Sequence, residues 1–260
     1  MKDYVIFATD LARKAGTIIT ENLSLGMKKE LKKKDNSPFT ASDVFINNMV
    51  IEEIAREYPE HSVIGEEKSN ERDSDYVWVC DPIDGTIPFS SGIPISSFSL
   101  ALTKNGIPII GVIYDPFMDR LFVAEKGRGA CLNNEKIFIT QENTLKNQPV
   151  YMGWWKHSLY DLSLLRGNLS KRGIKIMDFC SFAYAGALVA AGEFSGIIFG
   201  DRYPWDVAAM KVIIEEAGGK CTDFTGENQR YDEETNGFVA GNVSVHSELL
   251  NLVKKFAVKN

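Results

Sequence analysis

The chain has 260 residues, of which 44% are hydrophobic, so it can bury a large core and is not a disordered protein. Its formal net charge of −6 argues against a broad nucleic-acid-binding surface. The lysine-rich run at residues 28–34 is the local exception, and we expect it to be a solvated loop or helix end. There is no apolar stretch of about 18 residues and no secretory-type amino terminus, so we expect a cytoplasmic protein without a membrane span.

The four cysteines lie far apart in the sequence and form no CxxC pair. This spacing predicts neither a zinc site nor a disulfide framework. We expect the thiols of Cys80, Cys131, Cys180 and Cys221 to be reduced and buried as small hydrophobic groups.

The first half of the sequence predicts two helices followed by an antiparallel sheet. Apolar residues recur with helical spacing over residues 4–23. A second helix is expected from residue 40 to about residue 58, because Thr40 and Asp43 have the spacing of a capping box. Short apolar runs between turn residues then predict strands at 62–65, 76–80, 96–103, 107–114, 120–124 and 130–132.

The second half alternates between the two kinds of element, which predicts a layered α/β arrangement. Strands are expected at 149–152, 174–179, 196–199 and 237–240. Helices are expected at 158–169, 182–191, 206–217 and 246–256. We expect one domain over residues 1–260, with a possible division into lobes 1–143 and 144–260 near the polar stretch at 140–148.

Two carboxylates follow the strand-like run at residues 76–80. Asp81 and Asp84 enter a turn that contains Pro82, Gly85 and Thr86. Two hard oxygen ligands at a strand end suit Mg²⁺, which often keeps open positions for a phosphate substrate. Because Pro-x-Asp-Gly is also an ordinary turn signature, this stretch alone leaves a turn and a metal site equally open.

Further acids come from separate places, and each has a simpler interpretation. Glu66 and Glu67 follow the strand at 62–65 and could form an exposed acidic turn. Asp206 could be only the N-cap of the helix that it opens, and Asp43 could be only a capping partner. The glycines at 218 and 219 would end the helix that begins at Asp206.

Taken together, the motifs resemble the inositol monophosphatase family of Mg²⁺-dependent, lithium-sensitive phosphatases. The family pattern W-x-x-D-P-[IL]-D-G-T matches residues 78–86, and G-E-E matches residues 65–67. The second signature, W-D-x-A-A followed by E-A-G-G, matches residues 205–209 and 216–219. The resemblance covers nearly the whole chain and implies the alternating α-β-α-β-α sandwich of fructose-bisphosphatases and inositol monophosphatases.

The resemblance also implies a metal centre with two or three Mg²⁺ ions. One ion would be held by Glu66, Asp81 and the backbone carbonyl of Ile83, and a second by Asp81, Asp84 and Asp206, so that Asp81 bridges the two. Two metals about 3.5–4 Å apart can clamp the attacking and leaving oxygens of an in-line displacement.

The remaining implied roles concern water and substrate. Thr86, paired with Asp43, would orient or deprotonate the attacking water, with Glu66 or Glu67 assisting. The N–H groups of Gly85 and Thr86 would approach the phosphate. The implied substrate contacts come from Asp84, Gly85, Thr86, Ser181, Phe199 and Asp206. None of His61, His157 and His246 matches a family catalytic position, and we expect all three to be structural or on the surface.

The chain departs from the family pattern on the substrate side. Phe199 stands where inositol-hydrolysing members carry a glutamate, seven residues before Asp206, and a phenyl ring cannot bond a polyol hydroxyl. Phe182 is bulky where alanine is common, and Pro88 replaces an asparagine. The segment at 37–43 is more similar to the branches that hydrolyse histidinol phosphate or 3′-phosphoadenosine 5′-phosphate, whereas residues 111–116 are similar to the inositol and sugar-phosphate branch.

The sequence therefore predicts Mg²⁺-dependent hydrolysis of a small phosphate monoester of the inositol- or sugar-phosphate type. Histidinol phosphate and 3′-phosphoadenosine 5′-phosphate are the alternative substrates. An alternative of another class is a weakly catalytic relative that regulates a partner by binding. The expected partner is a small phosphorylated metabolite, with neither nucleic acid nor membrane, and the resemblance implies a homodimer.

Overall fold

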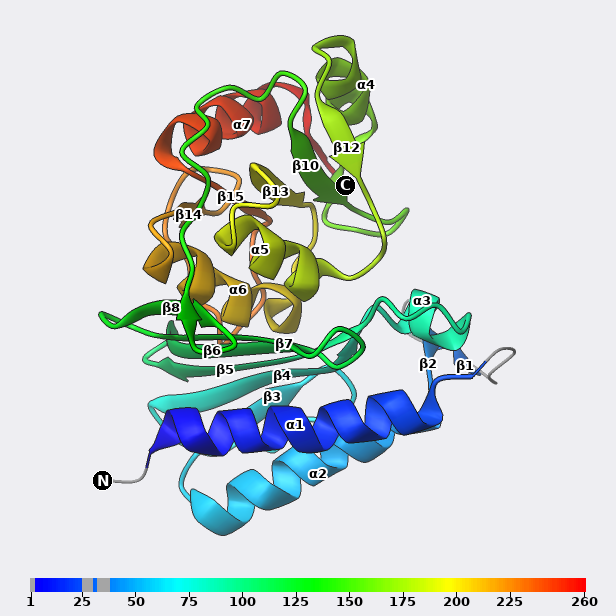
Figure 1. The fold of residues 1–260 in the computed structure, drawn as a ribbon, viewed down its shortest axis with the longest axis vertical. Coiled ribbons are helices and arrows are strands. Elements are labelled where there is room, and N and C mark those ends of the chain that lie inside the picture. Colours follow the sequence, from blue (N-terminus) through cyan, green and yellow to red (C-terminus); the bar gives the residue numbers. More distant parts are fainter. Residues whose placement is uncertain (1–2, 25–29, 32–37) are drawn as a thin grey trace.

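A computed structural model describes residues 3–24, 30–31 and 38–260. Figure 1 shows five layers: helices α1 and α2, a seven-stranded sheet, helices α5 and α6, a five-stranded sheet, and finally α4 and α7. The predicted α-β-α-β-α sandwich is thus confirmed. The lysine-rich run at 28–34 lies outside the described residues except for positions 30–31, and the division into two lobes stays a prediction.

The outermost layer is formed by α1 (Tyr4–Asn22) and α2 (Ala41–Glu57), close to the predicted bounds. The buried residues of α1 recur at helical spacing and face the sheet. At the start of α2, the N–H of Thr40 donates to the carboxylate of Asp43 at 2.7 Å, so the predicted capping box forms. None of the described helices is long and apolar enough to cross a lipid bilayer.

The seven-stranded sheet has the order β3-β4-β5-β6-β7-β8-β9. Its neighbours are antiparallel from β4 onward, as predicted, whereas β3 and β4 are parallel. The strands are β3 (Ser62–Gly65), β4 (Tyr76–Asp84), β5 (Ser97–Lys104), β6 (Ile107–Asp115), β7 (Arg120–Glu125), β8 (Gly129–Leu132) and β9 (Glu135–Lys136).

Strand β4 runs further than the predicted 76–80 and carries both carboxylates within it. Its register against β5 shifts between Asp81 and Asp84, where the chain turns toward the short helix α3 (Thr86–Ser90). Alternate residues of β4 face opposite layers, as in any strand. Val79 packs with α5 and α6, whereas Trp78 packs with α1 and α2. Asp81 continues the face of Val79 and so points toward α6.

The five-stranded sheet has the order β12-β10-β13-β15-β14, in which the β10–β12 and β10–β13 pairs are parallel. Its strands are β10 (Pro149–Gly153), β12 (Lys175–Met177), β13 (Gly196–Phe199), β14 (Lys220–Thr222) and β15 (Phe238–Gly241). Helices α4 (Ser163–Lys171) and α7 (Val243–Phe256) cover one face, and α5 (Phe182–Ala190) and α6 (Pro204–Glu216) cover the other. Two small ribbons pair β1 (Glu30–Leu31) with β2 (Pro38–Phe39) and β11 (Tyr160–Asp161) with β16 (Val258–Lys259).

Three further predictions are wrong: the start of one helix, the N-cap of another, and the burial of all four thiols. The helix expected from residue 158 begins only at Ser163, because Tyr160 and Asp161 pair with β16 near the carboxyl terminus. Helix α6 begins at Pro204 with Tyr203 as its N-cap, so Asp206 lies inside the first turn and is not the cap. The thiols are free, but those at positions 131 and 180 are only partly buried.

Close packing fixes α6 on the sheet. A Cβ atom at Gly111 of β6 would lie 2.5 Å from the carbonyl oxygen of Ala209, so the helix backbone rests directly on the strand. At the other end of α6, the carboxylate of Glu216 accepts the N–H groups of Gly127 and Gly129, each at 2.8 Å. Both contacts involve motif residues, and together they set where the first turn of α6 meets β4.

Candidate active site

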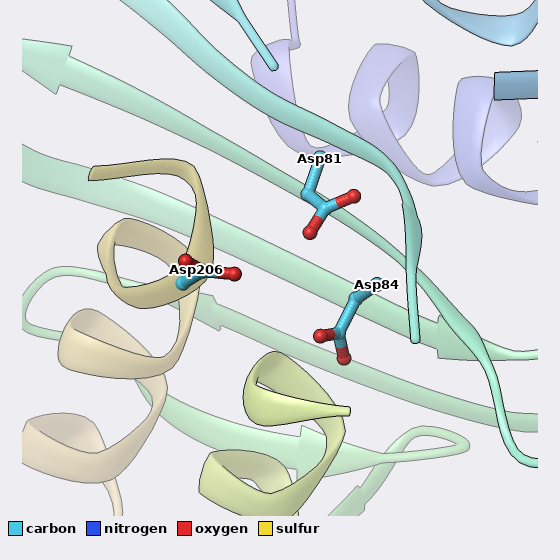
Figure 2. A group of neighbouring side chains, drawn as sticks. All are labelled: Asp81, Asp84 and Asp206. Carbon is cyan, nitrogen blue, oxygen red and sulfur yellow. The ribbon is translucent and has the colours of Figure 1, made fainter. Parts of the chain in front are cut away.

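Three carboxylates meet where the end of β4 faces the first turn of α6. Asp81, Asp84 and Asp206 each offer an oxygen atom, and these atoms all lie within 4.8 Å of one another. Figure 2 shows Asp81 and Asp84 projecting from the strand on the side where the helix that carries Asp206 lies. The structure therefore brings together the acids that the sequence assigned to the second metal.

Burial makes this cluster costly without a cation. Asp81 and Asp84 are almost fully buried, and burial raises the pKa of Asp81 well above its usual value. The neighbouring carboxylates of Glu66, Asp84 and Asp206 raise it further, because a second negative charge nearby disfavours ionisation. A divalent cation would neutralise these charges, so the carboxylate oxygens of this cluster fit a hard metal ion.

Asp84 is held by four donors from two elements. Its Oδ2 accepts hydrogen bonds from the hydroxyls of Ser181 at 2.6 Å and Ser97 at 3.0 Å and from the N–H of Tyr184 at 3.0 Å. Its Oδ1 accepts the N–H of Phe182 at 2.6 Å. Burial raises the pKa of Asp84, and these hydrogen bonds oppose the rise.

Thr86 and Asp43 come together from α3 and α2. The hydroxyl of Thr86 lies 3.3 Å from Oδ1 of Asp43 and 3.2 Å from the carbonyl oxygen of Ile83. Burial raises the pKa of Asp43 to about 7, the hydrogen bond from the hydroxyl of Thr40 opposes this, and the charge of Glu66 adds to it. Asp43 is therefore both the capping partner of the sequence prediction and a neighbour of Thr86.

Glu66 and Glu67 follow β3 and are partly buried, so the interpretation as an exposed acidic turn is wrong. The N–H of Glu66 donates to the carbonyl of Cys80 at 3.2 Å, which ties this segment to β4. The N–H of Glu67 donates to the side chain of Asn47 at 3.3 Å. The charge of Glu66 raises the pKa of both Asp81 and Asp43.

Gly85 links the two carboxylates of β4 to α3 in a left-handed conformation, with φ of 92°. A Cβ atom there would lie 2.9 Å from the carbonyl oxygen of Ile95 and 3.1 Å from Cβ of Ser181. A side chain is thus excluded both by conformation and by space. The roles of the Gly85 and Thr86 N–H groups toward phosphate stay predictions.

The expected substrate residues Ser181 and Phe199 are both buried. Ser181 hydrogen-bonds Asp84, and Phe199 at the end of β13 packs edge-on against the ring of Phe182, with centroids 4.7 Å apart. The ring of Phe182 also lies edge-on to the ring of Trp155, with centroids 6.3 Å apart, and Trp155 is 42% exposed. The rings of Phe199, Phe182 and Trp155 therefore form a row. It leads from Phe182, whose N–H donates to Asp84, to the exposed Trp155.

Sequence reasoning missed Ser97, Ser99 and Asn47. The hydroxyl of Ser99 is buried and makes no hydrogen bond within the described part of the chain, and Ser99 lies directly opposite Asp81 in the β4–β5 register. A ligand or water at the acidic cluster would satisfy it. The available signal was the alternation of side chains along the strand, because Ser97 and Ser99 lie on one face of a buried and mostly apolar strand.

The layered fold and its buried carboxylates define an α/β protein with a site suited to a divalent cation. Residues 1–257 match the family model described as "Inositol monophosphatase family". The chain belongs to this family and is a phosphoric monoester hydrolase.

Individual relatives cover almost the whole chain. It is 31% identical to a fructose-1,6-bisphosphatase/inositol-1-monophosphatase of Aquifex aeolicus, over 98% of this chain and 97% of the relative. It is 32% identical to the Nus factor SuhB of Escherichia coli K12, over 94% of this chain and 92% of that protein. The solved structure of a Thermotoga maritima IMPase superposes with a TM-score of 0.89 at 30% identity, covering 98% of both chains.

Proposed function

We propose that this protein hydrolyses a small phosphate monoester with Mg²⁺ as cofactor and water as nucleophile. The observation that carries the proposal is the cluster of buried Asp81 and Asp84 with partly buried Asp206, whose oxygens lie within 4.8 Å of one another in a member of a phosphatase family. Asp81 and Asp84 are buried and Asp206 is partly buried, so the mutual repulsion of the three carboxylates opposes folding unless a cation compensates it.

We base the proposed metal ligands on this cluster together with the family resemblance. Asp81, Asp84 and Asp206 would hold one ion, and Glu66, Asp81 and the carbonyl of Ile83 would hold another, with Asp81 shared. Bound cations supply Lewis acidity, since they lower the pKa of a bound water and neutralise charge on phosphate oxygens. Ser97 and the first turn of α5 orient the ligand Asp84 through hydrogen bonds.

The residues that would handle protons are Thr86 and Asp43. The Thr86 hydroxyl lies 3.3 Å from Asp43, so it can accept a hydrogen bond from water while it donates to the carboxylate. Because the pKa of Asp43 is raised to about 7, its carboxylate can take up a proton near neutral pH. Glu67 would assist from the β3 side, and the N–H groups of Gly85 and Thr86 would contact the phosphate.

The test is hydrolysis of p-nitrophenyl phosphate by purified protein with and without Mg²⁺. EDTA should abolish activity and added Mg²⁺ should restore it. Asp84→Asn and Asp206→Asn should each lower kcat by about 100-fold or more, because each removes a charged ligand. The exposed Asp73 provides the control Asp73→Asn, which should leave kcat unchanged. Wild-type turnover in either ligand variant would refute the assignment.

For the substrate we propose an inositol- or sugar-phosphate type of ester, which the names of the Aquifex and Thermotoga relatives support. The buried, apolar Phe199 argues against tight recognition of a polyol and keeps histidinol phosphate and 3′-phosphoadenosine 5′-phosphate as alternatives. Comparing kcat/KM for these esters and fructose 1,6-bisphosphate would rank them. Equal values for every ester would mean that the site does not select the organic group.

A second candidate is a binding role with weak catalysis, since the E. coli relative is named a Nus factor and not a phosphatase. All the implied ligands are present in this chain, and this favours the enzyme. The p-nitrophenyl phosphate assay separates the two. On the resemblance we also propose a homodimer and inhibition by Li⁺, to be checked by light scattering and by titrating LiCl into the assay.

A further inference from the structure

The two oxygens of Asp84 are occupied unequally. Oδ2 accepts three hydrogen bonds, from the hydroxyls of Ser97 and Ser181 and from the N–H of Tyr184. Oδ1 accepts one, from the N–H of Phe182. A carboxylate offers about four lone-pair positions over its two oxygens. Oδ2 is therefore saturated by the protein, and only Oδ1 keeps a lone pair for another partner.

These donors cannot easily turn away. Ser97 and Ser181 are both fully buried, and the other two donors are backbone groups at the start of α5. The N–H of Ser181 in turn donates to the hydroxyl of Tyr151 at 3.2 Å. Gly85 also approaches Ser181 so closely that a Cβ atom would lie 3.1 Å from the serine Cβ. The unequal occupancy of Asp84 is thus built into the packing of α5 against β4.

We propose that Ser97 and Ser181 restrict Asp84 to binding a metal through one oxygen, and that this restriction selects Mg²⁺ over Ca²⁺. Mg²⁺ demands near-octahedral geometry with few protein oxygens, whereas Ca²⁺ accepts six to eight oxygens and often takes both oxygens of one carboxylate. Saturating Oδ2 withholds the second oxygen that Ca²⁺ would use. The inference rests on the proposed function, because it concerns the same metal site.

The experiment measures metal binding and not turnover. Protein stripped of metal is titrated with MgCl₂ and, separately, with CaCl₂ by calorimetry, for the wild type, Ser97→Ala, Ser181→Ala and the double variant. The control is Thr103→Val, because Thr103 lies on β5 with Ser97, is buried, and donates its hydroxyl hydrogen to the carbonyl of Val77.

In the double variant, the ratio of the Ca²⁺ to the Mg²⁺ dissociation constant should fall by about tenfold or more, since losing hydrogen bonds to Oδ2 frees it for the larger ion. The single variants should fall between, and Thr103→Val should not change the ratio. Equal weakening of both ions would overturn the inference, because the serines would then only hold Asp84 in place. If the wild type binds neither ion, the proposed function itself fails.

Discussion

At the scale of single residues, His246 has a buried imidazole that cannot readily accept a proton. Its Nε2 lies 2.9 Å from the Thr222 hydroxyl, and that hydroxyl donates to the carbonyl of Asp223. Nε2 must therefore carry the hydrogen and donate. Burial, and then the charge of Lys220, lower the pKa of His246 to about 4.

This depressed pKa predicts a loss of stability in acid. As the pH falls from about 6.5 toward 4, the unfolded chain takes up a proton on this histidine that the folded chain refuses. The cost should reach about 2 kcal/mol at pH 5 and be absent at pH 8. Urea unfolding of the wild type and His246→Gln at both pH values measures it, because glutamine can still donate to Thr222 but does not titrate. Identical pH dependence in both proteins would contradict the pKa assignment.

The sequence identifies some residues of the candidate site and not others. Asp81, Asp84 and Asp206 stand in dense local motifs, and hard-ligand chemistry indicates what they can do. Ser97 stands in no motif, since its role arises only because β5 pairs with β4 and faces α5. The same holds for Ser181, which was expected to contact substrate but donates to Asp84 from 97 residues away.

At the scale of elements, α6 places Asp206 by resting on β6 at Gly111. A Cβ atom at this position would lie 2.5 Å from the carbonyl oxygen of Ala209 and 2.6 Å from a methyl group of Val212. Backbone cannot yield as a flexible side chain can. Any residue larger than glycine must therefore lift α6 away from the sheet.

Gly111→Ala should consequently destabilise the protein by about 2 kcal/mol or more and lower its affinity for Mg²⁺. Gly167→Ala is the matched control, because Gly167 lies inside helix α4 with nothing within 4 Å of an added Cβ atom. That control should stabilise by up to about 1 kcal/mol. Thermal unfolding and calorimetric Mg²⁺ titration check both variants. Normal Mg²⁺ affinity in Gly111→Ala would show that Asp206 does not depend on this contact.

The elements also show where sequence patterns stop being informative. Helices α1 and α2 begin close to their predicted starts because periodicity and the capping box are local properties. Helix α4 begins later than predicted because β11 pairs with β16 at the far end of the chain. Strand β4 continues to Asp84 because β5 pairs with it there, across a register shift that the turn signature conceals.

At the scale of the whole molecule, the candidate site combines parts from both halves of the sequence. Asp81 and Asp84 come from the seven-stranded sheet, and Asp206 comes from a helix between the two sheets. Folding must therefore bring like charges together in a buried place, and this opposes folding when no cation is bound. Stability and metal binding should be linked through this one cluster.

The linkage predicts that Mg²⁺ raises the melting temperature. At 100 times its dissociation constant, a ligand that binds only the folded chain adds about 2.7 kcal/mol, which corresponds to roughly 5–10 °C for a chain of this size.

In EDTA, Asp206→Asn should be more stable than the wild type by about 1–2 kcal/mol and should melt at a higher temperature. The reason is that it removes one of the charges that raise the pKa of Asp81. In saturating Mg²⁺ the order should reverse, since the variant has lost a ligand. Differential scanning calorimetry in EDTA and in Mg²⁺ gives all four values, with Asp73→Asn expected to follow the wild type in both. If Asp206→Asn melts lower than the wild type in EDTA, the carboxylates do not oppose folding, and the case for a cation at this cluster loses its electrostatic basis.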